Sequence, residues 1–395
     1  MMTVEGSQIN SQIIDRWINE ELLNRRLSGG VIEVIKGDKT LYQRTFGTKD
    51  EDQKIEMTRD TIFWIASMTK PIVSATALAL LEQGKFGLET SIAKYIPAYK
   101  NPVVLGSAGK FAKLKRDVTV LDLFRHTSGL TYGFSGEEDI HKLYDETSVY
   151  DFSNSNAEMA EKLSKIPLRN QPGEVFEYGM STDLLGFIIE CVTDQSLDEV
   201  VRQLITGPLE MSSTGFSPDI NTVAKAPPHI NDIGIKPPLG PDQKWHSGGG
   251  GLWSTLPDYK IFAKMLKNNG AVGKAKILRT ETISLLRQNH FPKGIRFGPY
   301  TSSLGITAPT QERGLGFGLG IAVREHDQIT PPGFKGEFFW PGVSGTNFWV
   351  DPLNDLIVIF MTYAPEHRGQ HRIDLRNAVY AALSEENCRE VTTDE

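Results

Sequence analysis

The two ends of the chain each combine a helix with a β-hairpin, and this arrangement constrains the fold more than any other feature. Residues 7–27 place apolar side chains at helical spacing, and the hairpin GVIEVIKGDKTLYQRTFG follows, with its turn at Gly37 and Asp38. Near the other end, TNFWVDPLNDLIVIFMTY predicts a hairpin with its turn at residues 351–355, and a helix is expected over residues 372–383. The pattern predicts one antiparallel sheet, built from both chain ends and flanked by the terminal helices.

Between these ends the pattern is mostly helical. Four segments have the apolar spacing of helices: VTVLDLFRHTSGL, NAEMAEKLSKI, STDLLGFIIECVTDQSLDEVVRQLI and TLPDYKIFAKMLKNNG. The expected architecture is a mixed α/β (α+β) fold with two domains. Residues 1–66 and 250–395 would form the sheet domain, and residues 67–249 an inserted, mostly helical domain.

The composition is that of a globular protein and excludes several functional classes. The chain has 395 residues, of which 39% are hydrophobic and 23% are charged, and its formal charge is −7. Without a basic run, this charge gives no support for a nucleic-acid partner. The two cysteines, Cys191 and Cys388, cannot form a disulfide framework, which fits a reducing compartment. The first residues lack the pattern of an export signal, and no apolar run reaches the roughly 20 residues of a membrane helix. We therefore expect a cytoplasmic protein without a membrane partner.

The segment FWIASMTKPI joins a strand-like approach to a helix and holds the first candidate for chemistry. Ser67 is expected at the helix N-terminus, and Lys70, three residues later, on the same helical face. A serine hydroxyl is a weak nucleophile, and a lysine can act as its base where burial or other cations lower the lysine pKa. The N–H of Ser67 would also be free to bind an oxyanion. The alternative is a capping serine beside a solvated lysine, and the surrounding sequence has to decide between the two.

The surrounding motifs resemble the superfamily of serine β-lactamases and penicillin-binding proteins, and most closely its esterase branch, the class C-like family VIII carboxylesterases. The similarity runs, in the order of the family, through VTVLDLFRHTSGLTYGF, QPGEVFEYGMSTDLLGFIIECVTDQSLDEVV, GGGGLWSTLPDYKIFAKML and FFWPGVSGTNFWVDPLNDLIVIFM. The resemblance implies the architecture described above, with the active site between the two domains. It also implies catalysis through an acyl-serine intermediate.

The resemblance gives roles to further residues. Tyr178 would form the proton-transfer pair with Lys70, and a phenol with a pKa near ~10 serves as a base only beside a cation. The N–H of Val343, which follows Gly342, would be the second oxyanion donor. Tyr132 follows the RHTSGL segment, and it either lines the acyl pocket or packs within a lid.

Two positions depart from the β-lactamase pattern. Met180 stands where lactamases carry a substrate-binding amide, and Trp340, Pro341 and Gly342 stand where they carry Lys-[Ser/Thr]-Gly. Without the amide and the lysine, polar groups of a β-lactam would stay unpaired in the site. The Trp-x-Gly sequence looks instead like the third motif of the esterase branch, so Trp340 and Gly342, together with Met180, are expected at an ester-binding site. Pro341 removes one strand N–H, and the sequence gives no reason for it.

Other signals carry less weight. GLGFGLG suits a strand rather than a nucleotide-binding loop, and GGGG suits a turn. His367 and His371 have zinc-binding spacing, but Arg368 stands where the glutamate is needed, so a surface pair is expected. His126 is expected to be a structural, hydrogen-bonding histidine. We expect neither a metal nor a cofactor.

Four functions remain open at this point. An esterase would cleave short-chain acyl or aryl esters, and an acyltransferase would use the same acyl-enzyme with another acceptor. A β-lactamase or D-amino-acid peptidase is disfavoured by the missing lysine motif. A non-catalytic binding protein is disfavoured by the intact Ser67, Lys70 and Tyr178. The expected partner is a small-molecule ester, while acyl length and the choice between monomer and homodimer do not follow from the sequence.

Overall fold

The main element is an antiparallel sheet that joins the two ends of the chain. The computed structural model describes residues 9–105, 110–230, 234–240 and 243–390. Within them the sheet has eight strands, in the order β12 (Leu315–Phe317), β13 (Ala322–Arg324), β14 (Phe338–Phe339), β15 (Asn347–Asp351), β16 (Leu356–Thr362), β1 (Gly29–Lys36), β2 (Lys39–Asp50) and β3 (Ile55–Glu56). All neighbouring strands are antiparallel, which confirms the predicted sheet.

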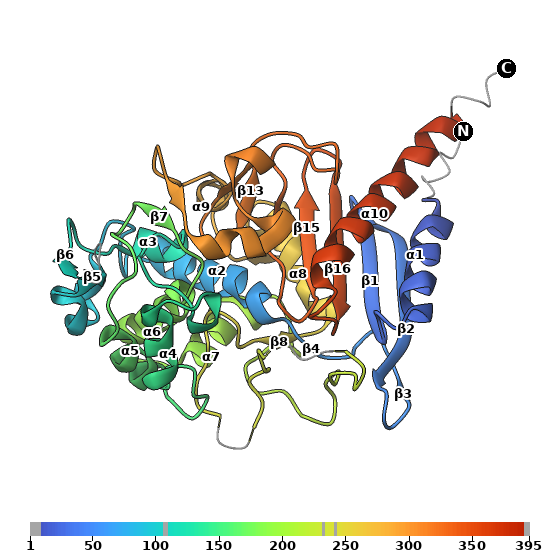
Figure 1. The fold of residues 1–395 in the computed structure, drawn as a ribbon. Coiled ribbons are helices and arrows are strands. Elements are labelled where there is room, and N and C mark those ends of the chain that lie inside the picture. The colour runs from blue at the N-terminus through green and yellow to red at the C-terminus, as the bar shows by residue number, and fades with distance from the viewer. Residues whose placement is uncertain (1–8, 106–109, 231–233, 241–242, 391–395) are drawn as a thin grey trace.

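Helices cover the sheet and form a second part of the molecule beside it (Figure 1). The described helices are α1 (Ser11–Leu23), α2 (Thr69–Glu82), α3 (Val120–Phe124), α4 (Asp139–Glu146), α5 (Asn156–Ser164), α6 (Ser181–Thr193), α7 (Leu197–Val201), α8 (Leu256–Lys267), α9 (Thr280–Leu286) and α10 (Arg368–Glu390). Short strand pairs lie outside the sheet: β4 (Phe63–Trp64) with β8 (Trp253–Ser254), β5 (Val103–Leu105) with β6 (Phe111–Lys113), β7 (Val175–Phe176) with β11 (Arg296–Phe297), and β9 (Ala271–Val272) with β10 (Ala275–Lys276).

The central pair of strands comes from opposite ends of the chain. β1 pairs with β16 along its length, from Gly30 opposite Thr362 to Lys36 opposite Leu356. Both strands also belong to the predicted hairpins, β1–β2 and β15–β16. The first hairpin turns at Gly37, whose φ of +61° is a conformation that glycine adopts at no steric cost.

Adjacent residues of β15 show that helices cover both faces of the sheet. Phe348 contacts Tyr259 of α8, with ring centroids 4.9 Å apart, whereas Trp349 contacts Tyr380 of α10 at 6.4 Å. Because successive strand side chains point to opposite faces, α8 and α10 lie on opposite sides of the sheet. α1 packs beside α10, so the two terminal helices share one face.

The mostly helical part is built around α2. Every residue of α2 from Thr69 to Leu80 is buried. A helix that is apolar on all sides belongs in a protein interior, which explains why this segment has no polar face. α6 and α7 pack against α2, and α3 packs against α6.

Three predicted helices have different lengths in the structure. α1 is shorter than predicted, although residues 7 and 8 lie outside the described residues, and α10 is longer than predicted. The helix expected from VTVLDLFRHTSGL ends at Phe124. The reason is a change of backbone conformation, since His126 has a φ of +54°, which an α-helix does not contain.

The expected surface pair of histidines is wrong for His371. This residue is buried, and its Nε2 lies 2.9 Å from Oε2 of Glu21 on α1, so it joins the two terminal helices. Across the described ranges, no group of three or more His, Cys, Asp or Glu side chains is placed to hold a metal ion. No described helix combines the length and apolarity needed to cross a membrane.

Candidate active site

Ser67 lies where β4 leads into α2. One 3₁₀ turn, Ala66–Met68, connects the two elements, so the α-helix begins at Thr69 rather than at Ser67 as predicted. The Ser67 hydroxyl does not cap the helix. It accepts hydrogen bonds from two other side chains, those of Lys70 and Tyr178.

Lys70 is fully buried beside Ser67. Its Nζ donates to Ser67 Oγ at 3.3 Å, to the Tyr132 hydroxyl at 3.1 Å and to the Gly249 carbonyl at 2.6 Å. None of these acceptors is charged. Burial lowers the pKa of Lys70 to about 7, and the nearby charge of Asp183 partly opposes this change. A lysine with this pKa is suited to accept a proton from serine near neutral pH.

Tyr178 approaches Ser67 as a hydrogen-bond donor. Its hydroxyl donates to Ser67 Oγ at 2.8 Å and accepts from Nε1 of Trp340 at 3.1 Å. Lys70 Nζ lies 4.6 Å from the centre of the Tyr178 ring. Burial raises the pKa of Tyr178, while the bonds to Ser67 and Trp340 oppose the rise. The expectation that Lys70 makes this phenol a base stays a prediction, since burial raises the phenol pKa while the lysine lies beside the ring.

Tyr132 contacts the same lysine, which makes it more than a packing residue. Its hydroxyl accepts from Lys70, its ring stacks on Phe134 at 4.7 Å, and it lines the cavity above Ser67. His126 lies behind Tyr178, with ring centroids 4.8 Å apart, and its Nδ1 accepts from the N–H of Gly179 at 3.4 Å. This is the structural role expected for His126.

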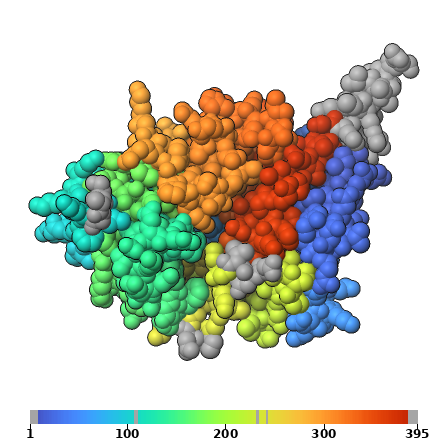
Figure 2. Space-filling view, in the orientation of Figure 1, coloured from blue at the N-terminus to red at the C-terminus, as the bar shows by residue number. Residues whose placement is uncertain are grey.

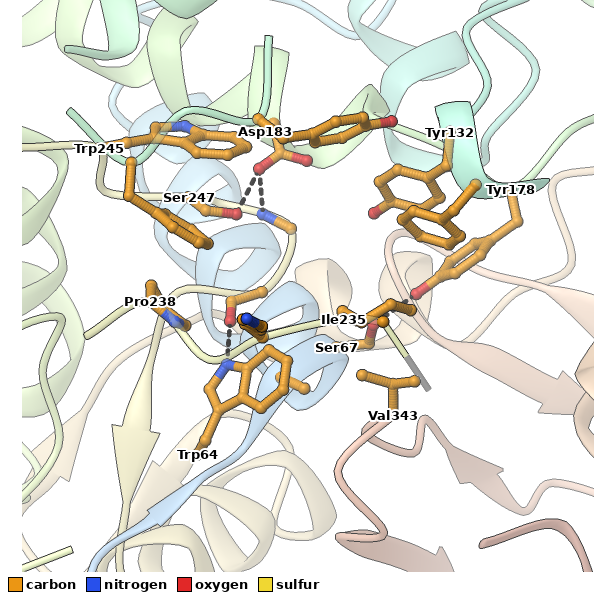
Figure 3. A pocket seen from close by; sticks show the side chains of 18 of the residues that line it. Trp64, Ser67, Tyr132, Tyr178, Asp183, Ile235, Pro238, Trp245, Ser247 and Val343 are labelled. Atoms are coloured by element: carbon orange, nitrogen blue, oxygen red, sulfur yellow. Dashed lines mark hydrogen bonds between the residues drawn. The ribbon is translucent and has the colours of Figure 1, made fainter. Parts of the chain in front are cut away.

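Asp183, which the sequence analysis did not single out, holds the turn that Lys70 contacts. Its Oδ1 accepts from Ser247 Oγ at 2.5 Å and from the Gly249 N–H at 3.0 Å (Figure 3). A Cβ at Gly249 would come within 2.3 Å of the Asp183 carboxylate, so this position requires glycine. Burial raises the pKa of Asp183, and the charge of Lys70 opposes the rise. The Gly249 carbonyl is thereby fixed against the lysine.

The turn after β14 docks onto the backbone that precedes Ser67. Ser344 Oγ donates to the Trp64 carbonyl at 2.7 Å, and Thr346 Oγ1 donates to the Ile65 carbonyl at 3.3 Å. A Cβ at Gly342 would lie 2.5 Å from the same Ile65 oxygen, so the close approach requires glycine here. These bonds hold together two segments that lie 280 residues apart in the sequence.

The docked turn places Val343 beside Ser67 (Figure 3). Both residues line the cavity, and within the described parts of the chain neither backbone N–H donates to another backbone carbonyl. Two such N–H groups beside a serine hydroxyl are able to bind an oxyanion. Pro341 lies beyond the end of β14 at Phe339, so its missing N–H interrupts no strand pairing.

The cavity above Ser67 has a volume of about 450 Å³, and aromatic side chains form a large part of its wall. Figure 2 shows the surface hollowed where the green, orange and red parts of the chain meet. The aromatic residues that line the cavity are Trp64, Tyr132, Phe134, Tyr150, Phe152, Tyr178, Trp245 and Tyr300.

Three residues predicted at the ester-binding site do not line this cavity. Met180 is fully buried, and Trp340 and Gly342 lie behind the wall. Trp340 contacts the site indirectly, because its indole N–H donates to the Tyr178 hydroxyl. Gly342 contributes the carbonyl half of the peptide group whose N–H belongs to Val343. The predicted substrate contact of Met180 is wrong, because its side chain packs in the hydrophobic core.

Comparison with known proteins places the chain in a family. Residues 14–382 match the family described as Beta-lactamase. The chain belongs to the β-lactamase family. This family consists of serine hydrolases, and its match covers both the Ser67–Lys70 segment and the turn at Val343.

Relatives within the β-lactamase family include esterases. Protein Rv1367c of Mycobacterium tuberculosis is 32% identical over 384 residues, covering 91% of this chain and 89% of that protein. Esterase EstB of Burkholderia gladioli is 29% identical over 387 residues, covering 93% and 94%. The solved structure of EstCE1, described as a hydrolase with promiscuous acyltransferase activity, has a TM-score of 0.79 at 26% identity, covering 94% and 98%.

Proposed function

We propose that this protein hydrolyses carboxylic esters through an acyl-Ser67 intermediate. The observation that carries the proposal is the convergence of Lys70 Nζ and the Tyr178 hydroxyl on Ser67 Oγ at the floor of an apolar cavity. A serine cap would need neither a buried lysine nor a phenol. The similarity to Esterase EstB supports the same assignment.

In the proposed acylation step, neutral Lys70 accepts the Ser67 proton while Oγ forms a bond to the ester carbonyl carbon. The carbonyl π electrons move to its oxygen, which the N–H groups of Ser67 and Val343 bind. Collapse of this intermediate breaks the bond to the alcohol. The proton held by Lys70 passes to the departing alcohol oxygen, with the Tyr178 hydroxyl as the relay.

Deacylation repeats the same steps with water in place of the alcohol. Lys70 accepts a proton from water, whose oxygen attacks the acyl carbon, and the oxyanion again forms beside Val343. The bond from Oγ to carbon then breaks, Ser67 regains its proton and the carboxylic acid leaves.

The wall of the cavity favours esters with apolar groups over β-lactams. Its aromatic side chains suit aryl or short alkyl groups. Position 180 offers no amide, and the indole N–H of Trp340 is already bonded to Tyr178. The polar groups of a lactam would therefore lack partners, which is costly in a buried site.

The test compares the hydrolysis of p-nitrophenyl butyrate with that of nitrocefin by the purified protein. We expect kcat/KM to be at least about 100-fold higher for the ester, because the lactam leaves buried polar groups unpaired. Fluorophosphonate should label Ser67, as located by mass spectrometry. A preference for nitrocefin would overturn the ester assignment.

Substitution of the nucleophile completes this test. Ser67→Ala should reduce ester turnover by about 10⁴-fold or more, and it should leave thermal unfolding nearly unchanged because the hydroxyl caps no helix. Ser74→Ala is the matched control, since it removes a buried hydroxyl of α2 that has no hydrogen-bond partner. The control should keep wild-type turnover. Full activity of Ser67→Ala would rule out the acyl-serine mechanism.

Acyl transfer is a second candidate, favoured by the likeness to EstCE1. An apolar wall lowers the local competition from water and can hold an alcohol as the acceptor. Adding benzyl alcohol to the ester assay and measuring the ratio of new ester to free acid distinguishes the two outcomes. A ratio that stays at zero would leave hydrolysis as the reaction.

A further inference from the structure

Arg372, on the first turns of α10, contacts the peptide that carries the proposed oxyanion donor. Its Nη2 donates to the carbonyl oxygen of Gly342 at 2.8 Å. That carbonyl and the N–H of Val343 belong to the same peptide group. The guanidinium and the oxyanion would therefore sit at the two ends of one amide.

Among the residues that the structure describes, no acidic side chain neutralises the charge of Arg372. Its electrostatic neighbours are the cation of Arg368 and the hydroxyls of Tyr178 and Tyr300. Burial, followed by the charge of Arg368, lowers the pKa of Arg372 to about 9, so it remains protonated at neutral pH. The residue as a whole is partly exposed, yet its Nε is shielded and has no partner.

A cation bonded to an amide oxygen changes the other end of the amide. It draws electron density towards the oxygen, which leaves the N–H more positive and makes it a stronger donor. Bonds from charged donors are also stronger than neutral ones, so they fix the plane of the peptide more firmly. Both effects act on the group that would bind the developing negative charge.

We propose that Arg372 is a positioning residue for ester cleavage, which polarises and orients the Gly342–Val343 peptide so that Val343 binds the oxyanion. The inference rests on the proposed acyl-Ser67 mechanism. It gives a role to a partly exposed cation that pairs with no carboxylate among the described residues.

The turn itself does not depend on Arg372 alone. The Gly342 carbonyl also accepts from the Gly345 N–H at 3.2 Å, and the Gly342 N–H donates to the Thr346 carbonyl at 2.8 Å. Removal of the guanidinium therefore leaves the backbone of the turn with neutral partners. Substitution of Arg372 can therefore test the polarisation of the Gly342–Val343 peptide while the turn keeps its backbone hydrogen bonds.

The test uses three variants. Arg372→Met removes the charge and keeps an unbranched side chain, Arg372→Lys restores a cation, and Arg368→Met is the matched control. Arg368 lies one helical turn earlier and donates to the Pro365 carbonyl rather than to the oxyanion peptide. Thermal unfolding of each variant checks that it is folded.

We expect Arg372→Met to lower kcat for p-nitrophenyl butyrate by about tenfold to 100-fold, since loss of a whole oxyanion donor costs about 10²–10³-fold. KM should change by less than about threefold, because the donor acts mainly in the transition state. A trifluoromethyl ketone, which forms an oxyanion on Ser67, should lose affinity in parallel with kcat/KM. Arg372→Lys should recover most of the loss, and Arg368→Met should match the wild type.

Several outcomes would overturn the role of Arg372. One is a wild-type kcat in Arg372→Met, and another is an effect of this substitution on KM alone. A third is an equal loss of kcat in Arg372→Met and Arg372→Lys, which would indicate that packing rather than charge matters. Phosphonylation of Ser67 by fluorophosphonate also depends on the N–H groups of Ser67 and Val343, but it needs no ester substrate. Its rate therefore tests Arg372 independently of ester cleavage. If fluorophosphonate labels the wild type but the wild type cleaves no ester, the proposed esterase function fails. The labelling rate of Arg372→Met then still decides whether Arg372 positions the oxyanion peptide. A wild type that does not label would overturn both.

Discussion

Two cations, the buried Lys70 and the partly exposed Arg372, lie behind the two halves of the site, and they differ in what they can do. Lys70 contacts Ser67, the proposed nucleophile, and burial lowers the pKa of Lys70 to about 7. Arg372 contacts the Gly342–Val343 peptide, which carries the proposed oxyanion donor, and burial lowers the pKa of Arg372 to about 9. Near neutral pH the first can exchange a proton and the second keeps its charge. A base has to lose its proton, whereas a polarising group has to keep it, so the two residue types are not interchangeable.

The largest loss of activity should come from replacing Lys70 with arginine, which makes both cations guanidinium groups. Lys70→Arg keeps the charge beside Ser67 but removes the base, because a guanidinium does not deprotonate at working pH. We expect kcat/KM for p-nitrophenyl butyrate to fall by about 10³–10⁴-fold, within the range attributed to general base catalysis. Lys85→Arg, at an exposed position just after α2, is the control and should match the wild type. Activity within tenfold of wild type in Lys70→Arg would show that another base acts on Ser67.

An intermediate effect should come from Tyr178, whose hydroxyl bonds to the same Ser67 oxygen as Lys70. Tyr178→Phe should lower kcat/KM by about 10²–10³-fold, because the proton relay and one bond to Oγ are lost together. The double variant with Lys70→Ala should be little worse than the poorer single variant, as groups that act as a unit are not additive.

Trp340→Phe sharpens the interpretation of Tyr178. It removes only the indole donor to the phenol oxygen, so its loss should stay within about tenfold. Losses that multiply in the Lys70 and Tyr178 double variant would mean that the two residues act in separate steps.

The smallest effect should be a displacement of the pH profile. The rate requires neutral Lys70, so kcat/KM should rise with pH through an apparent pKa about 7. The charge of Asp183 favours protonated Lys70 and so raises its pKa. Asp183→Asn removes this charge, and the rise should move to lower pH. An unchanged profile in a folded Asp183→Asn variant would indicate that Asp183 is uncharged in the native protein.

Local signals explain which parts of the fold the sequence could predict. Both hairpins carry turn residues between apolar runs, and Gly37 supplies the positive φ that its turn needs. The spacing of Ser67 and Lys70 likewise needs only a helical backbone. His371 was misplaced on the surface because its partner, Glu21, lies 350 residues away.

The rest of the site depends on contacts that no local pattern contains. Asp183 gave no distinct signal, because an acidic residue beside Ser181 and Thr182 in the first turn of a helix is ordinary. Arg372 gave none either, because an arginine at the start of the predicted helix 372–383 is ordinary. Met180 was assigned a substrate contact from its sequence position alone, and its side chain faces the core instead.

The pairing of β1 with β16 has a consequence for synthesis on the ribosome. The bond from Thr362 to Gly29 spans 333 residues, so at about 5–20 residues per second β16 emerges roughly 15–70 seconds after β1. During that interval β1 exposes an open edge of backbone N–H and C=O groups, which invites pairing with other nascent chains. The turn at Val343 also arrives late, long after Ser67 has left the exit tunnel. A chain stalled before this turn would carry its nucleophile without an oxyanion site, so the nascent protein should stay inert until its last strands are made.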